Sequence, residues 1–471
     1  MAATKTARKT RAGSAARKTA PGKAGPGPAA AGAKAAKASA KGAEGPLLVR
    51  MYRVGFGDFF LVTVPTADGP RFILIDCGVH LGDLGTMSDC VRDMAEYTDR
   101  KLALVIVTHR HADHISGFGS EEEQFKEFEV ESVWITNRLA PDNPQAVKTM
   151  QQVTALAQHL QLALGAREDN AGKRAKAMAG NALGIAKASN ADAMRVVTSG
   201  FKNKPDIHYY EAGDEPALPK SLQGALTARI LGPVGKDAAA EFKAADNKAA
   251  QYLAAVEDNG LPGGTFQPFD RRWPASAQDY PEAAFRSWRS SVFMEQKLIA
   301  MQPDMLAAAA ATIDGTLNNQ SLVVLFSCRG KQLLFVGDAQ WGNWASWLYG
   351  RPVKGKDPGI TPEARDLLST IDFYKVGHHG SKNATPIPAV GAMRWQCAGM
   401  CSTQDDCYSD VPRLPLLDAL DERTGKQMVR SDWIAVDGAE GKASEDARNR
   451  LSELPENFEE GELYIEYRLP D

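Results

Sequence analysis

Short apolar runs, bounded by glycine, proline and aspartate, recur through the first third of the chain. Runs of this length and composition predict buried β-strands. Every position of Leu102–Val107 is apolar, which is typical of a parallel strand whose two faces are both covered by helices. The strands predicted in this part span Leu47–Tyr52, Phe59–Val64, Arg71–Ile75, Leu102–Val107 and Val130–Thr136.

Helical spacing alternates with these strands. It predicts one helix over Met87–Tyr97 and a second that begins at Asn143-Pro144 and ends at Gly165. Residues 170–200, rich in alanine, lysine and asparagine, predict further helix on a polar surface. Alternation of strands and helices favours an α/β fold.

The second part of the chain repeats the strand pattern. Ser321–Phe326 and Lys331–Val336 predict a hairpin that turns at Arg329-Gly330. A short helix is expected to begin at Thr361-Pro362-Glu363. Further strands are predicted at Ile207–Tyr210, Ala225–Leu231 and Ile371–Val376.

Two stretches interrupt the strand pattern, at about 140–205 and 236–316. The second stretch has helical spacing at 238–256 and 282–311. Insertions of this size form lids or walls that decide what reaches a site, or they serve only as structural appendages. The sequence leaves both roles open.

Length and charge divide the chain into a tail and a domain. With 471 residues, 44% of them hydrophobic, the chain can bury a substantial core, and we expect 46–471 to form one large domain. Residues 1–45 contain ten lysines and arginines against the single acid Glu44, although the whole chain has a net charge of −3. We expect a disordered basic tail. It either binds nucleic acid by releasing counterions or only aids solubility.

Six cysteines in a chain of this length form no disulfide framework and fit a reducing compartment. Cys397, Cys401 and Cys407 lack the paired spacing of a zinc ribbon, so we expect free thiols. The sequence contains no apolar window long enough to span a membrane, and its start lacks the apolar core of a secretory signal. We expect a soluble, cytoplasmic protein, with import into an organelle as the alternative.

The segment His109-Arg110-His111-Ala112-Asp113-His114 follows the apolar run Leu102–Val107. Imidazole nitrogens and carboxylate oxygens are the ligands that Zn²⁺ and similar metals prefer. Three histidines and one aspartate within six residues therefore predict a metal site.

Other aspartates and histidines stand at the ends of predicted strands, where α/β proteins place their chemistry. Asp76 follows one strand, Asp338 a second, and His378-His379 a third. Asp76 either caps its turn or orients a neighbouring ligand by hydrogen bonding. The shared position at strand ends favours the functional role.

These features resemble the metallo-β-lactamase fold superfamily, whose H-x-H-x-D-H signature is matched by His109, His111, Asp113 and His114. The chain is most similar to the soluble metallo-β-lactamase domain of ComEC-type competence proteins. The matching segments are 55–58 (GFGD, usually GQGD), 74–78 (LIDCG), 318–323 (NNQSLV), 336–338 (VGD), 376–381 (VGHHGS) and 402–432.

The resemblance implies a four-layer αββα sandwich with helical insertions, and two divalent metal ions, zinc or alternatively manganese. The implied ligands are His109 and His111 for the first metal, Asp113, His114 and His379 for the second, and Asp338 as the bridge. A catalytic role is implied for Asp113, with Asp76 beside it. His378 would contact a substrate phosphate or donate a proton, and which of His378 and His379 is the ligand stays open.

Many members of the superfamily have one more histidine ligand between the signature and the bridging aspartate. Only His159 and His208 are available here, neither in a convincing motif, and ComEC-like domains also tend to lack this ligand. We retain His208 as a candidate extra ligand and expect His80 to be structural. The first metal site would then be weaker or more open.

The implied ligand set supports hydrolysis, because two adjacent divalent ions supply a hydroxide and stabilise charge on the attacking and leaving oxygens. We expect a phosphodiesterase or nuclease acting on nucleic acid or a phosphate-ester metabolite. The same chemistry suits a lactone, carboxylic-ester or phosphocholine-ester hydrolase. A third hypothesis is a nucleic-acid-binding protein with a mainly structural metal site. The oligomeric state cannot be deduced from the sequence.

Overall fold

The computed structural model describes residues 45–82, 84–164, 170–183, 189–234, 251, 310, 313–349, 359–405, 407–408, 411–433 and 454–470. The predicted tail, 1–45, lies outside the described residues except for Gly45. Most of the predicted insertion at 236–316, including its two expected helices, also lies outside them. Mixed α/β structure with two sheets fills the described part.

The larger sheet has eight strands in the order β13-β14-β1-β2-β3-β4-β5-β6. Strands pair antiparallel from β13 to β3 and parallel from β3 to β6. The central strand β4 is buried at every position from Leu102 to Val107, as its apolar run predicts. The strands are β1 (Leu48–Tyr52), β2 (Phe59–Thr66), β3 (Gly69–Cys77), β4 (Lys101–Val107), β5 (Glu129–Thr136), β6 (Asp206–Tyr210), β13 (Phe458–Glu460) and β14 (Tyr464–Arg468).

The smaller sheet has six strands in the order β12-β11-β10-β9-β8-β7. Strands β8 and β9 form the predicted hairpin, and Arg329 and Gly330 at its turn both have a positive φ, as a tight two-residue hairpin turn requires. The strands are β7 (Thr227–Gly232), β8 (Val323–Cys328), β9 (Lys331–Phe335), β10 (Phe373–Lys375), β11 (Ala398–Cys401) and β12 (Met428–Arg430).

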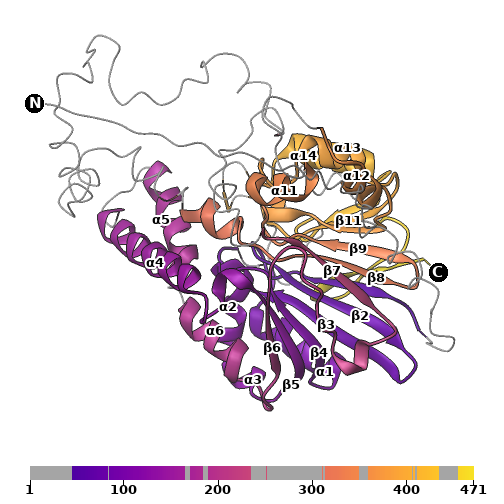
Figure 1. The fold of residues 1–471 in the computed structure, drawn as a ribbon, viewed down its shortest axis with the longest axis horizontal. Helices are drawn as coiled ribbons and strands as arrows, with labels where there is room; N and C mark the ends of the chain where they lie inside the picture. The colour runs from indigo at the N-terminus through magenta and orange to yellow at the C-terminus, as the bar shows by residue number, and fades with distance from the viewer. Residues whose placement is uncertain are drawn as a thin grey trace, which may run out of the picture. The chain divides into compact units, whose positions relative to one another are not determined.

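The two sheets pack face to face around one shared hydrophobic core (Figure 1). Phe60 of β2 meets Phe335 of β9 with ring centroids 6.2 Å apart. Trp134 of β5 stacks on Phe326 of β8 at 6.3 Å. Side chains that alternate along each strand therefore fill the space between the sheets.

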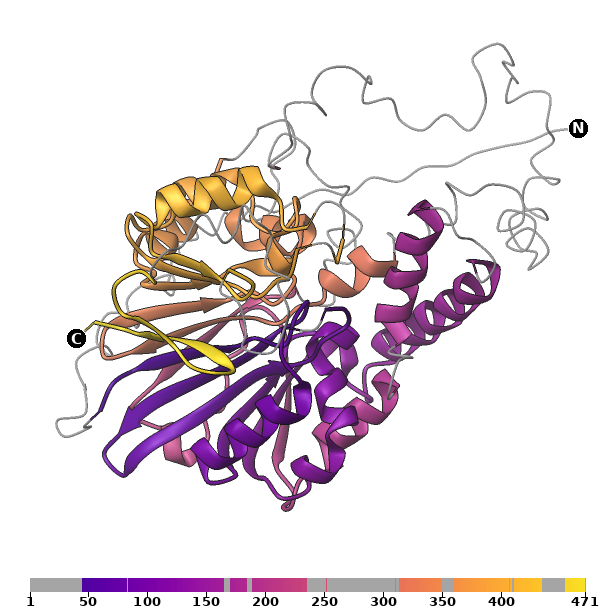
Figure 2. The same ribbon diagram turned by 180° about the vertical axis from the view of Figure 1, so that it is seen from behind.

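Helices cover the outer face of each sheet (Figures 1 and 2). Apolar side chains at helical spacing bury one stripe of each helix against its sheet. On the larger sheet lie α1 (Met87–Thr98), α2 (Ala112–Ser120), α3 (Glu122–Phe125) and α6 (Asn190–Ser199). On the smaller sheet lie α11 (Trp341–Leu348), α12 (Pro362–Ser369), α13 (Ile387–Ala392) and α14 (Leu414–Arg423).

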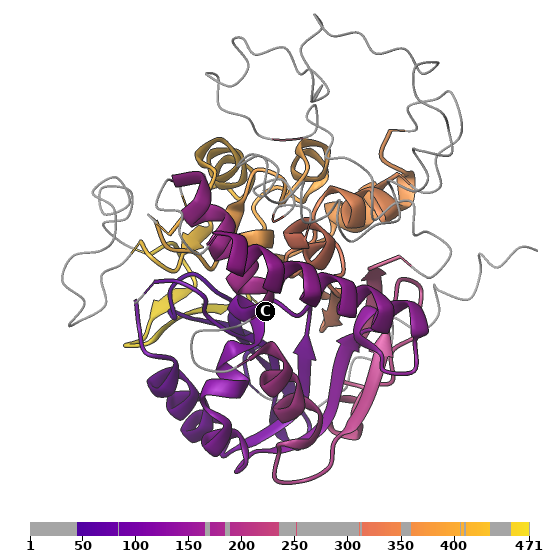
Figure 3. The same cartoon turned by 90° about the vertical axis from the view of Figure 1, so that its left-hand side faces the viewer.

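The first predicted insertion contains α4 (Pro144–Leu164), α5 (Asn170–Leu183) and α6. Helices α4 and α5 lie side by side (Figure 3). Their apolar side chains form a small separate core with Ile313 and Leu317. The expectation of a polar surface is wrong for α6, because Ala193, Val196 and Val197 recur at helical spacing and are buried against the larger sheet.

The six cysteines form no disulfide, as the sequence predicts, and five of them are buried. A search of the described helices finds none with both the length and the apolar character that a membrane crossing needs.

The shared core leads to a prediction about stability. Replacing Phe335 with alanine should lower the free energy of unfolding by about 3–5 kcal/mol, because it leaves a cavity between the sheets. Urea denaturation measures this loss. The control is Leu162→Ala on α4, where the leucine is 81% exposed, and it should change stability by less than about 0.5 kcal/mol. Equal losses in the two variants would contradict a core at this place.

Candidate metal centre

The segment His109–His114 begins shortly after β4 and continues into the first turn of α2, so Asp113 and His114 are helical residues; we call this segment the histidine loop. His109, His111, Asp113 and His114 are all buried, with at most 1% of their surface exposed. Gly78, directly after β3, packs against this loop so closely that a Cβ atom would overlap the main chain of Asp113 and His114. The loop is therefore held in place by the neighbouring strand end.

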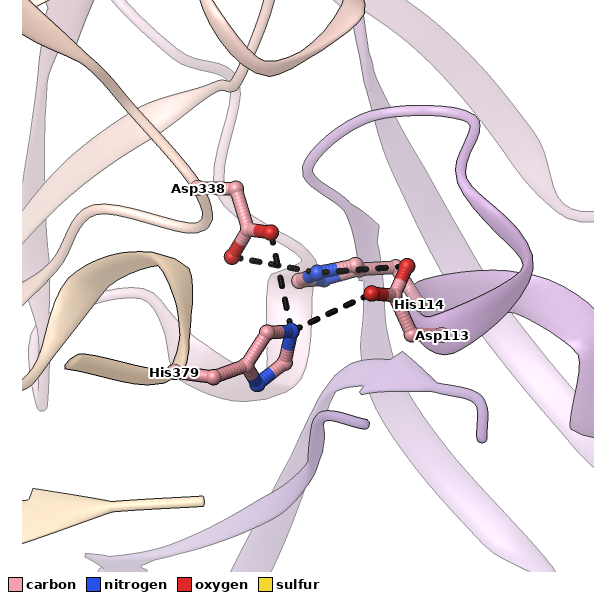
Figure 4. A group of neighbouring side chains, drawn as sticks. All are labelled: Asp113, His114, Asp338 and His379. Atoms are coloured by element: carbon pink, nitrogen blue, oxygen red, sulfur yellow. Dashed lines mark hydrogen bonds and ion pairs between the residues drawn. The ribbon is translucent and has the colours of Figure 1, made fainter. Parts of the chain in front are cut away.

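Asp113, His114, Asp338 and His379 come together although they lie on three separate segments (Figure 4). Each offers a ligand atom, and these atoms lie within 4.8 Å of one another. His114 Nε2 is 3.1 Å from Asp338 Oδ1, and His379 Nε2 is 3.2 Å from Asp113 Oδ2. Such a set could hold a metal ion.

A second group joins His109 and His111 to Asp113, again with ligand atoms within 4.8 Å of one another. His109 Nε2 and His111 Nδ1 are 3.0 Å apart. Burial, together with the neighbouring imidazoles of His114 and His111, lowers the pKa of His109 well below its ordinary value. Neutral imidazoles are the form that binds metal.

Two buried carboxylate oxygens in these groups make no hydrogen bond within the described part of the chain. They are Asp113 Oδ1 and Asp338 Oδ2. Leaving a buried acceptor unsatisfied costs about 1–3 kcal/mol, and more when it is charged. The residues present therefore fit a bound cation, which would accept these lone pairs.

Asp76 contacts the side of the His114 ring that faces away from the first group. Its Oδ2 lies 2.7 Å from His114 Nδ1, the nitrogen that faces away from Asp338. Asp76 is itself held by Thr108, whose main-chain N–H and hydroxyl donate to its two oxygens over 2.8 and 2.6 Å. Burial disfavours a protonated imidazole, yet the surrounding carboxylates, Asp338 first and Asp76 next, raise the pKa of His114 well above its ordinary value.

The two adjacent histidines after β10 have different surroundings. His379 is buried, its Nδ1 bonds the carbonyl of Ser402 at 2.8 Å, and its Nε2 faces the carboxylates. The side chain of His378 is 17% exposed, and its Nε2 lies 4.0 Å from Asp338 and 3.1 Å from the amide nitrogen of Asn318. Of these two histidines, only His379 belongs to a group of possible metal ligands among the described residues.

Three of these site residues adopt left-handed backbone conformations. Asp76, His378 and His379 have φ angles of 55°, 45° and 52°. Such angles are uncommon outside glycine and persist where the surroundings enforce them, often at functional sites.

Asp58 and Lys375 form a buried ion pair beside these groups, and no sequence motif marked Lys375 as a site residue. Lys375 forms an ion pair with Asp58 and lies 3.8 Å from Asp338, and all three side chains are buried. Burial works against the ammonium, but Asp58 and Asp338 hold the pKa of Lys375 above its ordinary value. The GFGD turn was the only available sign of Asp58.

Three other histidines, His208, His159 and His80, are described by the structure. His208 on β6 stacks on Tyr210, with ring centroids 5.8 Å apart, and His159 on α4 is exposed. His80 is half-buried after β3. None of the three belongs to a ligand group among the described residues. The group around His109 and His111 therefore gains no third histidine from them.

Asn181 on α5 reaches into the site from the predicted insertion. Its Nδ2 donates to Asp113 Oδ2 over 3.0 Å, and its Oδ1 accepts the main-chain N–H of Asp113 over 3.2 Å. Asn190, at the start of α6, donates to the carbonyls of Arg110 and Asn181 over 2.7 and 3.0 Å. Asparagine is unfavourable within helices, which is the one feature of the sequence that singles out these two residues.

In comparisons with known proteins, no family model and no curated protein matches this chain.

The contact between Asn181 and Asp113 gives a prediction. Asn181→Leu keeps the approximate volume but removes both hydrogen bonds, so we expect zinc affinity to fall about 10- to 100-fold. Competition with a chromophoric chelator measures the affinity.

The control is Asn203→Leu, because the side chain of Asn203 also makes two hydrogen bonds, both to the main chain of Val130. It should lower stability and leave zinc affinity unchanged. Unchanged zinc affinity in Asn181→Leu would show that Asp113 needs no support from α5.

Proposed function

We propose that the chain is a metal-dependent hydrolase with the four-layer metallo-β-lactamase fold, and that it cleaves phosphodiesters. The fold assignment is supported by two facing sheets whose outer surfaces carry helices. The residues of the H-x-H-x-D-H signature, together with Asp338 and His379, support the metal centre.

One observation carries the proposal: negative charge is concentrated and buried where imidazole nitrogens converge. Asp58, Asp76, Asp113 and Asp338 are each at most 1% exposed. Lys375 is the only buried lysine or arginine that forms an ion pair with them among the described residues. Buried carboxylates without sufficient positive charge are costly. Divalent cations held by these side chains would supply the missing charge, and we propose two, zinc or alternatively manganese.

Each group of residues then has a distinct task. His109 and His111 would hold one ion, and Asp113, His114 and His379 the other, with Asp338 between them. Asp76 keeps His114 in the orientation that presents Nε2. When bound, a pair of divalent ions lowers the pKa of water to near neutrality and stabilises charge on the attacking and leaving oxygens.

The polar surroundings of His378 favour a phosphate ester over an apolar lactone. His378 Nδ1 lies 3.4 Å from the amide nitrogen of Gln340 and 3.3 Å from Asn383 Oδ1, and its Nε2 lies beside Asn318. Amide and imidazole N–H groups at the partly exposed edge of the site suit the oxygens of a phosphodiester. His378 is placed to contact the phosphate or to protonate the leaving oxygen.

The metal content of variants tests the metal centre. The parent should bind two divalent ions per chain, and Asp113→Ala and His114→Ala should each lose at least one ion and the activity on bis(p-nitrophenyl) phosphate. Elemental analysis and absorbance assays measure both. The controls His159→Ala and His208→Ala should keep both ions and full activity. A folded parent that binds no ion would contradict the proposal.

The adjacent histidines are expected to differ. His379→Ala should lose metal, because Nε2 of His379 faces Asp113 and Asp338. His378→Ala should keep both ions and lose about 10²- to 10⁴-fold in kcat, the usual contribution of a proton donor. Metal content and steady-state kinetics on the two variants check this. Metal loss in His378→Ala alone would reverse the two roles.

Substrate class is settled by parallel assays of the parent with bis(p-nitrophenyl) phosphate, single-stranded DNA and a lactone, each with and without a chelator. Chelator-sensitive cleavage of the phosphodiester or the DNA supports the proposal. Cleavage of the lactone alone would favour an ester hydrolase. DNA binding that depends on residues 1–45, without any hydrolysis, would favour a nucleic-acid-binding protein.

A further inference from the structure

A groove of about 830 Å³ lies between α4 and α6. One wall is formed by Val147, Met150 and Thr154 of α4, and the other includes Met194 of α6. Leu139 and Tyr209 also line it, together with Arg110 of the histidine loop. None of the residues in the three groups of possible metal ligands, one of which is Asp58, Asp76 and His114, is among the lining residues, so the groove is separate from the candidate metal centre.

The lining is apolar apart from a few amides and hydroxyls, and the only charged lining residues among those that the structure describes are Arg110 and Arg195. Arg195 is already neutralised, because its two terminal nitrogens pair with the carboxylate of Glu122 over 3.2 and 2.7 Å. No aspartate or glutamate is among the lining residues. Any charge left to recognise a ligand in this groove is therefore positive and comes from Arg110.

Arg110 is a partly buried cation without a counter-charge. Its Nε is buried and makes no hydrogen bond, and within the described ranges no carboxylate forms an ion pair with its guanidinium. Arginine is normally buried only when it is paired, because its hydrogen-bond donors must be satisfied.

We propose that this groove binds a small amphipathic anion, with a carboxylate or phosphate on Arg110 and an apolar chain between α4 and α6. The volume lies in the range of about 300–1,000 Å³ that is usual for small-molecule sites. An anionic head group would pair with the guanidinium of Arg110 by charge-assisted hydrogen bonds. The apolar walls would take the body of the ligand out of water.

Calorimetric titration of the full chain with three ten-carbon probes tests this site. Decanoate and decyl phosphate, below their micelle concentrations, should bind at one site per chain, and the decyltrimethylammonium cation should bind at least tenfold more weakly. Comparing the two anions identifies the preferred head group. The titrations are repeated in the presence of a chelator. Equal affinities with and without the chelator would show that binding in the groove does not require the metal centre.

Two variants locate the binding. Arg110→Gln should weaken both anions about tenfold or more, since it removes the charged partner, whereas Arg92→Gln on the exposed face of α1 should change nothing. Thr154→Trp should block the groove even if Arg110→Gln fails to fold, and circular dichroism confirms that it is folded. Absence of binding, equal binding of anions and cation, or full affinity in Thr154→Trp would each overturn the proposal.

Discussion

The burial of negative charge between the ends of β3, β4, β9 and β10 is the constraint on which the rest of the site depends. Asp76, Asp113 and Asp338 lie at or after the ends of different strands. Asp58 lies close to them, and Lys375 forms an ion pair with it. Removing carboxylates from water is unfavourable unless positive charge and hydrogen bonds replace the lost solvation. The raised pKa of His114 shows the same demand, because these carboxylates stabilise positive charge at its ring.

Much of the fold follows from local sequence pattern, because the order of apolar and polar residues in a strand indicates which of its faces are buried. The uniform apolar run of β4 predicted a strand covered on both faces, and the Arg329-Gly330 turn predicted the β8–β9 hairpin. The pairing of strands that are distant in the sequence cannot be predicted from such a pattern. Nothing in residues 464–468 indicates that they lie beside β1, since register between distant segments depends on the assembled core.

The same distinction applies to the site. The residues of the histidine loop could be recognised because their spacing is local, and Asp338 and His379 because each ends a strand. Lys375 and Asn181 are different, since one stands in an apolar strand and the other in a polar helix. Their roles depend on contacts across the fold, with Asp58 and Asp113, that no local spacing encodes. His208 had suitable chemistry but lies on β6, outside both ligand groups.

The position of β1 between β2 and β14 affects how the chain must be made. Arg50 of β1 pairs with Glu466 of β14, which lies 416 residues later. At a synthesis rate of ~5–20 residues per second, one edge of β1 waits roughly 20 to 80 seconds for its partner. During that interval the edge offers unpaired main-chain groups to other nascent chains. Correct pairing therefore requires that this edge of β1 stays free of other strands until β14 has been synthesised.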